Sequence, residues 1–600
     1  MKRQFIIGTI LATLIAASAQ AATFVTVNSN VVASARWTRN NVYILTRVIF
    51  VEPGVTLTIE PGTIIRGVRA GAAGSDIASE PGSLVAARDG KIVANGTPDD
   101  PIVMTSIDDP HVIGGAATIP ASYTNSQSNL KVVVAQNYAP DGPTATNGFA
   151  YNQQWGGLVI LGNAYVANYN IAGAPTVDGD ANGLPDAPHN LVDPTNFNVG
   201  GFGRDFIEGL DPVTIPSAGT LGIYGNKTDA DNSGVYRFVS CRYGGFKIGG
   251  NNEINAITTG GTGSGTVMEF CEVAFNVDDG FEFFGGKMDT RHLYSNYIMD
   301  DNFDMDEGYR GTNQFWFILQ GNIGVARSGY PVNNTLTGVT FTDTQFDNLF
   351  EIDGAEANNN ASLPYTNVSV FNLTVLSGGS ASSEFTIVQD ARVFINNAVG
   401  SKLADLAELS QTALDPIGTI TDVSNFHYFF DANLGTTEDK AFTDLVAPLT
   451  TSAIEELSLQ VVGDAFYTKN GVDPRLAVGS AALVEDGPLP PAGLVQVNYA
   501  GYQRNNTFLS GWSIIDYLDV LPTTNVARPA VTIAGATNPI VSFASAGATI
   551  KYVIEKSTDK RTWTPVNGGT PLSAAGTITH TDLTTTLTAG TPVYYRAYAL

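Results

Sequence analysis

The chain has few cysteines and histidines for its length. Of its 600 residues, 2 are cysteine and 5 are histidine. Cys241 and Cys271 form no CxxC pair, and the scattered histidines show no zinc-binding spacing. A GxSxG nucleophile motif and a P-loop are also absent from the sequence. These absences exclude the common zinc sites, the serine-hydrolase elbow and the P-loop type of nucleotide site.

Basic residues are scarce as well. The chain carries 31 Lys and Arg against 57 Asp and Glu, a formal net charge of −26. Phosphate binding needs basic patches, so this balance predicts no nucleic-acid partner. It also disfavours an anionic membrane surface. A strongly acidic protein is instead suited to hard cations, which prefer oxygen ligands.

Long hydrophobic runs are missing except near the N-terminus. Lys2 and Arg3 precede an apolar run over residues 5–17, which is short for a membrane span, and Ala19-Gln20-Ala21 follows as a cleavage pattern. We therefore expect residues 1–21 to be a signal peptide. The mature chain should have no membrane span and should be exported, either to the periplasm, to the cell surface or into the medium.

The residues that are abundant indicate short strands and frequent turns. Hydrophobic residues make up 43%, charged residues only 15%, and there are 63 glycines. In "VEPGVTLTIEPGTIIRG" (51–67), Pro53-Gly54 and Pro61-Gly62 specify type II turns, each followed by a short β-branched run. Strands this short, separated by turns at this spacing, predict a parallel β-solenoid, in which each coil stacks on the previous one.

An internal repeat indicates the length of one coil. The segment 278–284, "DDGFEFF", recurs 22 residues later as "DDNFDMD" at 300–306. Alternate residues of a strand face opposite sides. We therefore predict that Phe281 and Phe303 stack inside the solenoid, while Glu282 and Asp304 stack outside.

Several phrases together resemble a known family. They are "VEPGVTLTIEPGTIIRG", "GKIVANGTPDDPIVMTS", "WGGLVILGNA", "DDGFEFFGG" and "DDNFDMDEGYRG". They are similar to secreted right-handed parallel β-helix proteins of environmental bacteria, often called pectin-lyase-like. The resemblance covers roughly residues 40–515 and implies an all-β fold with a right-handed parallel β-helix. Its motifs are specific for fold and carry little information on activity.

The expected domain order follows from changes in composition. We expect a β-helix with long inserted loops over 22–520, a Pro- and Thr-containing linker over 521–530, and a small antiparallel β-sandwich over 531–600. The alternating C-terminal segments resemble a fibronectin-type-III module. Helical spacing of apolar residues predicts short surface helices over 401–411 and 451–459.

The first candidate site is the set of acidic residues on the repeated coil. If the 22-residue register holds, carboxylates of neighbouring coils stack at about 4.8 Å, and like charges so placed repel. A bound Ca²⁺ would relieve the repulsion, whereas the alternative is a solvated acidic face balanced by nearby basic residues. The candidate ligands are Asp278, Asp279, Glu282, Asp300, Asp301, Asp304 and Asp306.

The second candidate is an acidic loop at 178–186. Asp178, Asp180 and Asn182 occupy positions 1, 3 and 5 of a calcium-loop pattern, Gly183 follows at position 6, and Asp186 stands at position 9. The glutamate expected at position 12 is missing. The alternative is an ordinary Asp- and Gly-rich loop.

Whether the protein is an enzyme is left open by the sequence. A resemblance to pectate lyases would imply Ca²⁺ on clustered aspartates and an arginine, Arg310 or Arg291, that takes a proton. A hydrolase would instead use paired acids such as Asp279 and Asp301. Fold alone does not establish activity, so we favour a structural, adhesive or glycan-binding role with calcium. The alternative is a polysaccharide lyase or glycoside hydrolase acting on an acidic polysaccharide.

The two cysteines could pair. The segments "FVSCRYGG" and "EFCEVAFN" resemble each other at an offset of 30 residues, which would place Cys241 and Cys271 on neighbouring coils. Export would permit a disulfide there. The alternative is two small, buried apolar residues.

Overall fold

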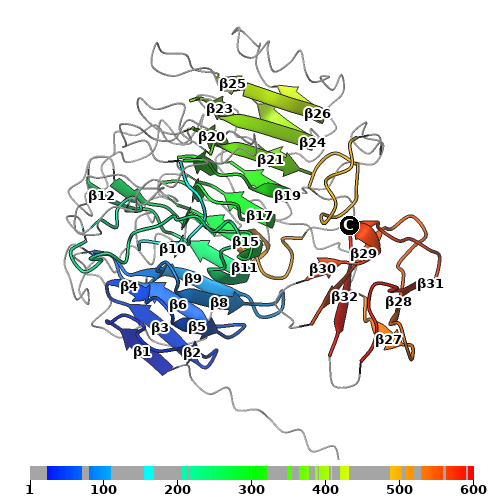
Figure 1. Ribbon diagram of the computed structural model, residues 1–600, viewed down its shortest axis with the longest axis horizontal. Coiled ribbons are helices and arrows are strands. Elements are labelled where there is room, and N and C mark those ends of the chain that lie inside the picture. The colour runs from blue at the N-terminus through cyan, green and yellow to red at the C-terminus, as the bar shows by residue number, and fades with distance from the viewer. Residues whose placement is uncertain are drawn as a thin grey trace, which may run out of the picture.

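A computed structural model of the chain describes two bodies of strands and a segment that joins them (Figure 1). The structure describes residues 23–70, 80–107, 109, 155–167, 206–211, 215–249, 252–276, 278–298, 300–320, 348–354, 364–376, 385–389, 391–403, 407–408, 419–430, 485, 487–502, 508–517, 529–558, 563–588 and 592–600. The predicted signal peptide, the acidic loop 178–186 and the predicted helix 451–459 lie outside these residues.

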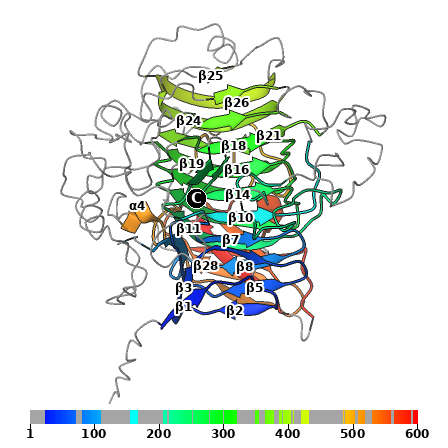
Figure 2. The ribbon, with the colours of Figure 1, turned by 90° about the vertical axis from the view of Figure 1, so that its left-hand side faces the viewer.

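The first body is a stack of coils made of parallel strands (Figure 2). A 15-stranded sheet forms two of its sides, and it contains β1 (Thr23–Val27), β2 (Ala35–Trp37), β3 (Asn41–Leu45), β5 (Thr56–Ile59), β6 (Ile64–Gly67), β8 (Lys91–Asn95), β9 (Ile102–Ser106), β11 (Gly234–Arg242), β15 (Val267–Ala274), β17 (Thr290–Asn296), β19 (Thr312–Leu319), β21 (Asn367–Phe371), β22 (Thr374–Leu376), β24 (Arg392–Leu403) and β26 (Thr419–Phe430). β11 pairs with β8 through its first half and with β9 through its second half, so the sheet bends in the middle of the long strands.

A 9-stranded parallel sheet closes the third side of each coil. In chain order it contains β4 (Val48–Val51), β7 (Ser83–Ala86), β10 (Leu158–Leu161), β14 (Ile257–Gly260), β16 (Phe281–Phe284), β18 (Phe303–Asp306), β20 (Phe350–Ile352), β23 (Phe385–Ile387) and β25 (Ala407–Glu408). A separate antiparallel hairpin is formed by β12 (Phe246–Gly249) and β13 (Asn252–Ile254). Three sides of stacked parallel strands confirm the predicted parallel β-helix.

The 22-residue repeat sets the register of this third sheet. Phe281 lies opposite Phe303, with ring centroids 5.2 Å apart and planes 9° apart, and both side chains are fully buried. Phe350 continues the stack at 5.5 Å from Phe303. The predicted interior stack is therefore confirmed.

Aromatic columns occupy the corners between the sides. Phe238, Phe270, His292 and Phe315 all have positive φ angles between 49° and 62° and lie at the bend of successive long strands. Their rings stack one on another at 4.6, 4.1 and 4.7 Å. A positive φ is unfavourable for bulky residues. Ring stacking and burial offset that cost, so the columns fix where each coil turns.

Of the two interpretations of the cysteines, the structure supports two small buried residues and not a disulfide. Cys241 and Cys271 are both free and buried. They do lie on the neighbouring strands β11 and β15, but Cys271 is opposite Val239 and Cys241 is opposite Val273. Two residues of offset separate their Cα atoms by about 8 Å, beyond the reach of a disulfide. The coil here repeats at 32 residues, not at 30.

The predicted helix over 401–411 is wrong where the structure describes it, because β24 and β25 extend into this range. Pairing with neighbouring coils overrides the local helical spacing. The described helical elements are α4 (Ile514–Tyr517) and the 3-10 turn η4 (Asn567–Gly569).

The second body is a small β-sandwich at the C-terminus, as predicted. One antiparallel sheet has β27 (Thr532–Ala534), β28 (Ile540–Ala544) and β31 (Thr577–Thr581). The other has β30 (Thr564–Pro565), β29 (Tyr552–Ser557) and β32 (Tyr594–Ala599). Val541, Phe543, Tyr552, Ile554 and Ile578 fill the core between them.

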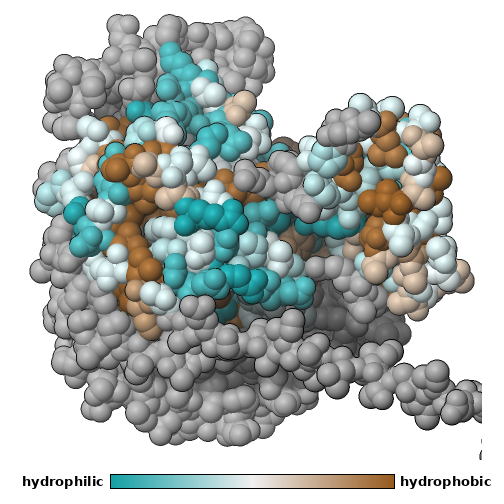
Figure 3. All heavy atoms as spheres, turned by 90° about the horizontal axis from the view of Figure 1, so that it is seen from below, coloured by the Kyte–Doolittle hydropathy of each residue, from teal (hydrophilic) through white to brown (hydrophobic). Residues whose placement is uncertain are grey.

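Ion pairs and a covering segment hold the sandwich against the β-helix. Arg291 of β17 contacts Glu555 of β29 at 3.0 Å. Residues 487–502 and 508–517 lie on the β-helix beside it, where Gln314 exchanges two hydrogen bonds with the backbone of Val495. Seen from the end that carries β1 to β3, the sandwich stands beside the stack, and the described surface mixes hydrophilic and hydrophobic residues (Figure 3).

Candidate metal centre

The outer face of the 9-stranded sheet changes from apolar to acidic along the stack. One row of mutually opposite residues can be followed over eight strands: Phe50, Val85, Val159, Thr258, Glu282, Asp304, Glu351 and Thr386. The first three are buried in an apolar cluster that also contains Ile207, Leu210, Ile215, Ala218 and Tyr224. Three carboxylates on consecutive coils then follow. We call Glu282, Asp304 and Glu351 the acidic row, and Thr258 precedes it.

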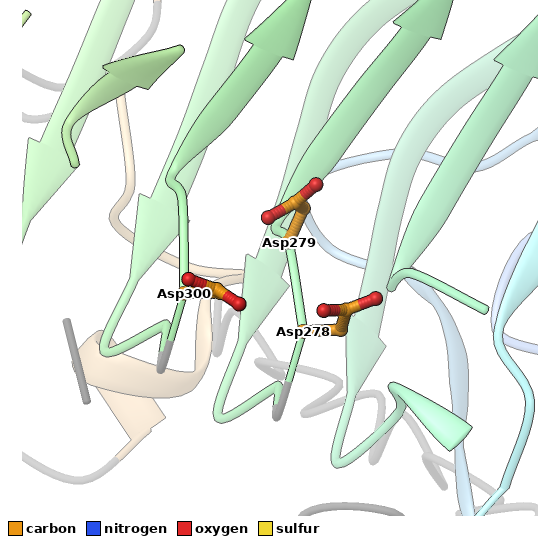
Figure 4. Close-up of side chains that lie close together, drawn as sticks. All are labelled: Asp278, Asp279 and Asp300. Atoms are coloured by element: carbon orange, nitrogen blue, oxygen red, sulfur yellow. The ribbon is translucent and has the colours of Figure 1, made fainter. Parts of the chain in front are cut away.

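More aspartates lie in the turns that lead into these strands. One carboxylate oxygen from each of Asp278, Asp279 and Asp300 lies within 4.8 Å of the other two (Figure 4). The same holds for Asp279, Glu282 and Asp304. Asp279 therefore belongs to both groups and joins the turn to the row. Five of the seven predicted ligands of the repeated coil therefore come together, whereas Asp301 and Asp306 belong to neither group.

Two of the aspartates also hold the coils together. The Oδ1 atom of Asp279 accepts the backbone N–H of Asp301 at 3.0 Å, and Oδ1 of Asp301 accepts that of Asn348 at 2.6 Å. The Oδ1 atom of Asn255 likewise accepts the backbone N–H of Asp279 at 2.9 Å. Each of these residues stands two positions before its strand, so they form a ladder along the stack. One oxygen of Asp279 and one of Asp301 are used for structure.

The surroundings of the cluster disfavour the charged form of its carboxyl groups. Burial raises the pKa of Asp279, Glu282, Asp301 and Asp304 well above their ordinary values. Neighbouring carboxylates raise these pKa values further; they include Asp278, Asp300, Asp306, Glu208 and Glu351. For Asp301, the charge of Glu351 is the largest contribution to the raised pKa after burial.

Direct hydrogen bonds compensate this charge in part. Asn255 donates its side-chain N–H to Oε2 of Glu282. Asp306, at the end of β18, accepts the backbone N–H of Glu307 through Oδ1. In contrast, Oδ1 of Asp304 is buried without a hydrogen-bond partner among the described residues. An oxygen in that position is available to a cation.

The two arginines considered for catalysis are both engaged elsewhere. Arg310 forms a bidentate pair with Asp229, at 2.8 Å for each bond. Burial alone would raise the pKa of Asp229, but this pair outweighs burial and the pKa is lowered. Arg291 lies in the 15-stranded sheet, where it pairs with Glu269 and Glu555. Its guanidinium is buried at the contact with the sandwich, away from the acidic row.

Some residues of the site could not be singled out from the sequence. The 22-residue repeat does not mark four of them, because their coils are offset from it by other numbers of residues. The offset is 24 residues for Asn255 and Thr258, and 47 residues for Asn348 and Glu351. The acidic loop with Asp178, Asp180, Asn182 and Asp186 is outside the described residues.

Comparison with protein families agrees with the fold. A family model described as "pectate-lyase like beta helix domain" matches residues 29–148 and 217–456. The match spans more than half of the chain, which therefore belongs to this family. No curated protein and no solved structure matches the chain. Among the described residues, no helix is both long and apolar enough to cross a membrane.

Proposed function

We propose that this chain is an exported β-helix protein with a structural, adhesive or glycan-binding role, and that its acidic row binds Ca²⁺. Family membership supports a carbohydrate-related role. The proposal of a cation rests on the geometry of three carboxylates. The cation would contact Glu282, Asp304 and Asp279, which converge within 4.8 Å.

The observation that carries the proposal is the stacking of Glu282 on Asp304 at strand spacing. Two like charges on opposite residues destabilise a sheet. The chain keeps acids at this row position on three consecutive coils, and Glu282 is only 4% exposed. Burying an uncompensated carboxylate costs several kcal/mol. A divalent cation with oxygen ligands removes that cost and links β16 to β18.

Ca²⁺ suits this site better than other metals. Every ligand candidate is an oxygen, which disfavours soft metals that require cysteine or histidine. Ca²⁺ tolerates irregular sets of six to eight oxygens, whereas Mg²⁺ demands near-octahedral geometry. The carboxylates come from adjacent coils and turns and are not arranged around an octahedron by a single loop.

The positions of the other candidates favour binding over catalysis. Asp279 and Asp301 each use one oxygen to hold the next coil, and both are more than nine-tenths buried. Arg310 and Arg291 are held in ion pairs. A lyase or hydrolase would need such groups free to reach a sugar.

The test is calorimetric titration of the purified chain, freed of metal by chelator, with CaCl₂. We expect saturable binding and a higher melting temperature with Ca²⁺. A glycan array tests the binding role, and incubation with acidic polysaccharides tests for cleavage. Absence of Ca²⁺ binding would refute the cation site, and depolymerisation would replace the binding role with catalysis.

A further inference from the structure

Thr258 stands at the boundary between the apolar and acidic parts of the outer face. On one side its row neighbour is Val159, which is buried in the apolar cluster. On the other side it is Glu282, which lies opposite Thr258 in the register of β14 and β16. Residues opposite each other on parallel strands point to the same face, about 4.8 Å apart. The Thr258 hydroxyl therefore lies on the face that carries the carboxylates.

The Thr258 hydroxyl has no hydrogen-bond partner among the described residues. Its side chain is 2% exposed, and Oγ1 is buried. Thr386, at the other end of the row, differs because its hydroxyl donates to Oδ1 of Asn348 at 3.1 Å. A buried hydroxyl without a partner is unfavourable, and native structures rarely keep one without a reason.

Building on the proposed Ca²⁺ site, we infer that the Thr258 hydroxyl is a further ligand of the cation held by Glu282 and Asp304. A hydroxyl has two lone pairs and no charge. It therefore adds a hard oxygen without adding to the repulsion of the row. This ligand extends the site onto β14, so one cation links the coils of β14, β16 and β18.

A neutral ligand beside the three carboxylates also bears on the choice of metal. Ca²⁺ takes six to eight oxygens, so an added protein oxygen replaces a water with little strain. Mg²⁺ keeps several of its waters and gains little from a ligand outside its octahedron. Loss of the hydroxyl should therefore weaken Ca²⁺ binding more than Mg²⁺ binding.

The experiment compares two valine variants of adjacent residues in the full chain. Thr258→Val removes the hydroxyl that faces the row. Thr259→Val is the matched control, because Thr259 is also buried with an unpartnered hydroxyl but faces the interior, opposite Phe283. Thr258→Ser keeps the oxygen. Each protein is titrated with CaCl₂ and with MgCl₂ by calorimetry, and its melting temperature is measured in chelator.

We expect Ca²⁺ affinity to fall about tenfold in Thr258→Val. It should stay near wild type in Thr259→Val and in Thr258→Ser, and Mg²⁺ affinity should change little. The melting temperature of Thr258→Val in chelator should not fall, because an unpartnered hydroxyl has been removed. Unchanged Ca²⁺ affinity in Thr258→Val, or an equal loss in both valine variants, would overturn the inference. If the wild type bound no Ca²⁺, the proposed function itself would fail.

Discussion

Glu282 and Asp304 lie directly opposite each other on β16 and β18, and both carboxylates face outward. The residues on either side of them in each strand face inward and are fully buried, such as Phe281 and Phe303. The same 22-residue repeat therefore builds a stabilising aromatic stack inside and a destabilising acidic stack outside. Repeating the sequence of a coil also stacks its carboxylates, and the proposed cation would offset the repulsion between them.

The first prediction concerns the acidic row. Wild-type protein should melt at a lower temperature in chelator than in Ca²⁺, since saturating ligand adds about 2.7 kcal/mol at a hundredfold excess over its dissociation constant. The double variant Glu282→Gln and Asp304→Asn should lose this difference. In chelator it should melt no lower than the wild type, because the repulsion has been removed.

The control is Asp100→Asn, which removes an acid that pairs with Arg39 on the surface. This variant should keep the full response to Ca²⁺. A double variant that still responds would place the cation elsewhere, and the acidic loop at 178–186 would be the next site to test.

The second prediction concerns the interior stack. Phe303 packs between Phe281 and Phe350 and lies 4.1 Å from the ring of Trp316. Phe303→Ala should lower the free energy of unfolding by about 3–5 kcal/mol, measured by urea denaturation. Phe303→Leu leaves a smaller cavity and should cost less. Equal stability of the alanine variant and the wild type would contradict the packing described here.

The sequence predicts the coil where the repeat is regular. From Asp278 to Asp306 the spacing of Phe281 and Phe303 was enough to derive both the interior stack and the outer carboxylates. Between β11 and β15 the coil carries an inserted hairpin and repeats at 32 residues. An alignment based on the two cysteines alone was two residues out of register.

The partners of charged residues were not predictable in the same way. Arg291 pairs with Glu555, which lies 264 residues away in the sandwich. No local pattern indicates which distant segment will cover a given side of the β-helix. The positive φ angles of Phe238 and Phe270 were also not predictable, since propensities favour glycine in that conformation.

The third prediction concerns the two cysteines. Burial raises the pKa of Cys271 to about 12 and raises that of Cys241 as well, so neither thiol should react in the folded protein. A thiol reagent should detect no free cysteine in native protein and both cysteines after denaturation without reductant. Absence of thiols in the denatured protein would mean that a disulfide forms despite the register.

The fourth prediction concerns the contact between the β-helix and the sandwich. Glu269 accepts ion pairs from Arg237 and Arg291, and all three side chains are buried. Removing one partner of such a network leaves buried charge without compensation. Glu269→Gln should therefore lower the free energy of unfolding by about 3–5 kcal/mol at neutral pH. Glu485→Gln is the control, because the exposed pair of Glu485 with Lys551 should contribute no more than about 1 kcal/mol.

The effect of Glu269→Gln should also depend on pH. Burial alone would raise the pKa of Glu269, but Arg237, Arg291 and Arg596 outweigh it and hold that pKa below its ordinary value. A lowered pKa in the folded state gives stability that is fully present above the ordinary value near 4.3 and is lost as the pH falls. The stability difference between wild type and Glu269→Gln should thus be constant from pH 7 to about 5. It should then shrink by about 1.4 kcal/mol for each pH unit below the ordinary value. Urea denaturation of both proteins from pH 7 to 3 measures this difference directly, and the titrations of all other groups cancel to first order. A difference that did not change with pH would show that the network acts through packing and not through the charge of Glu269.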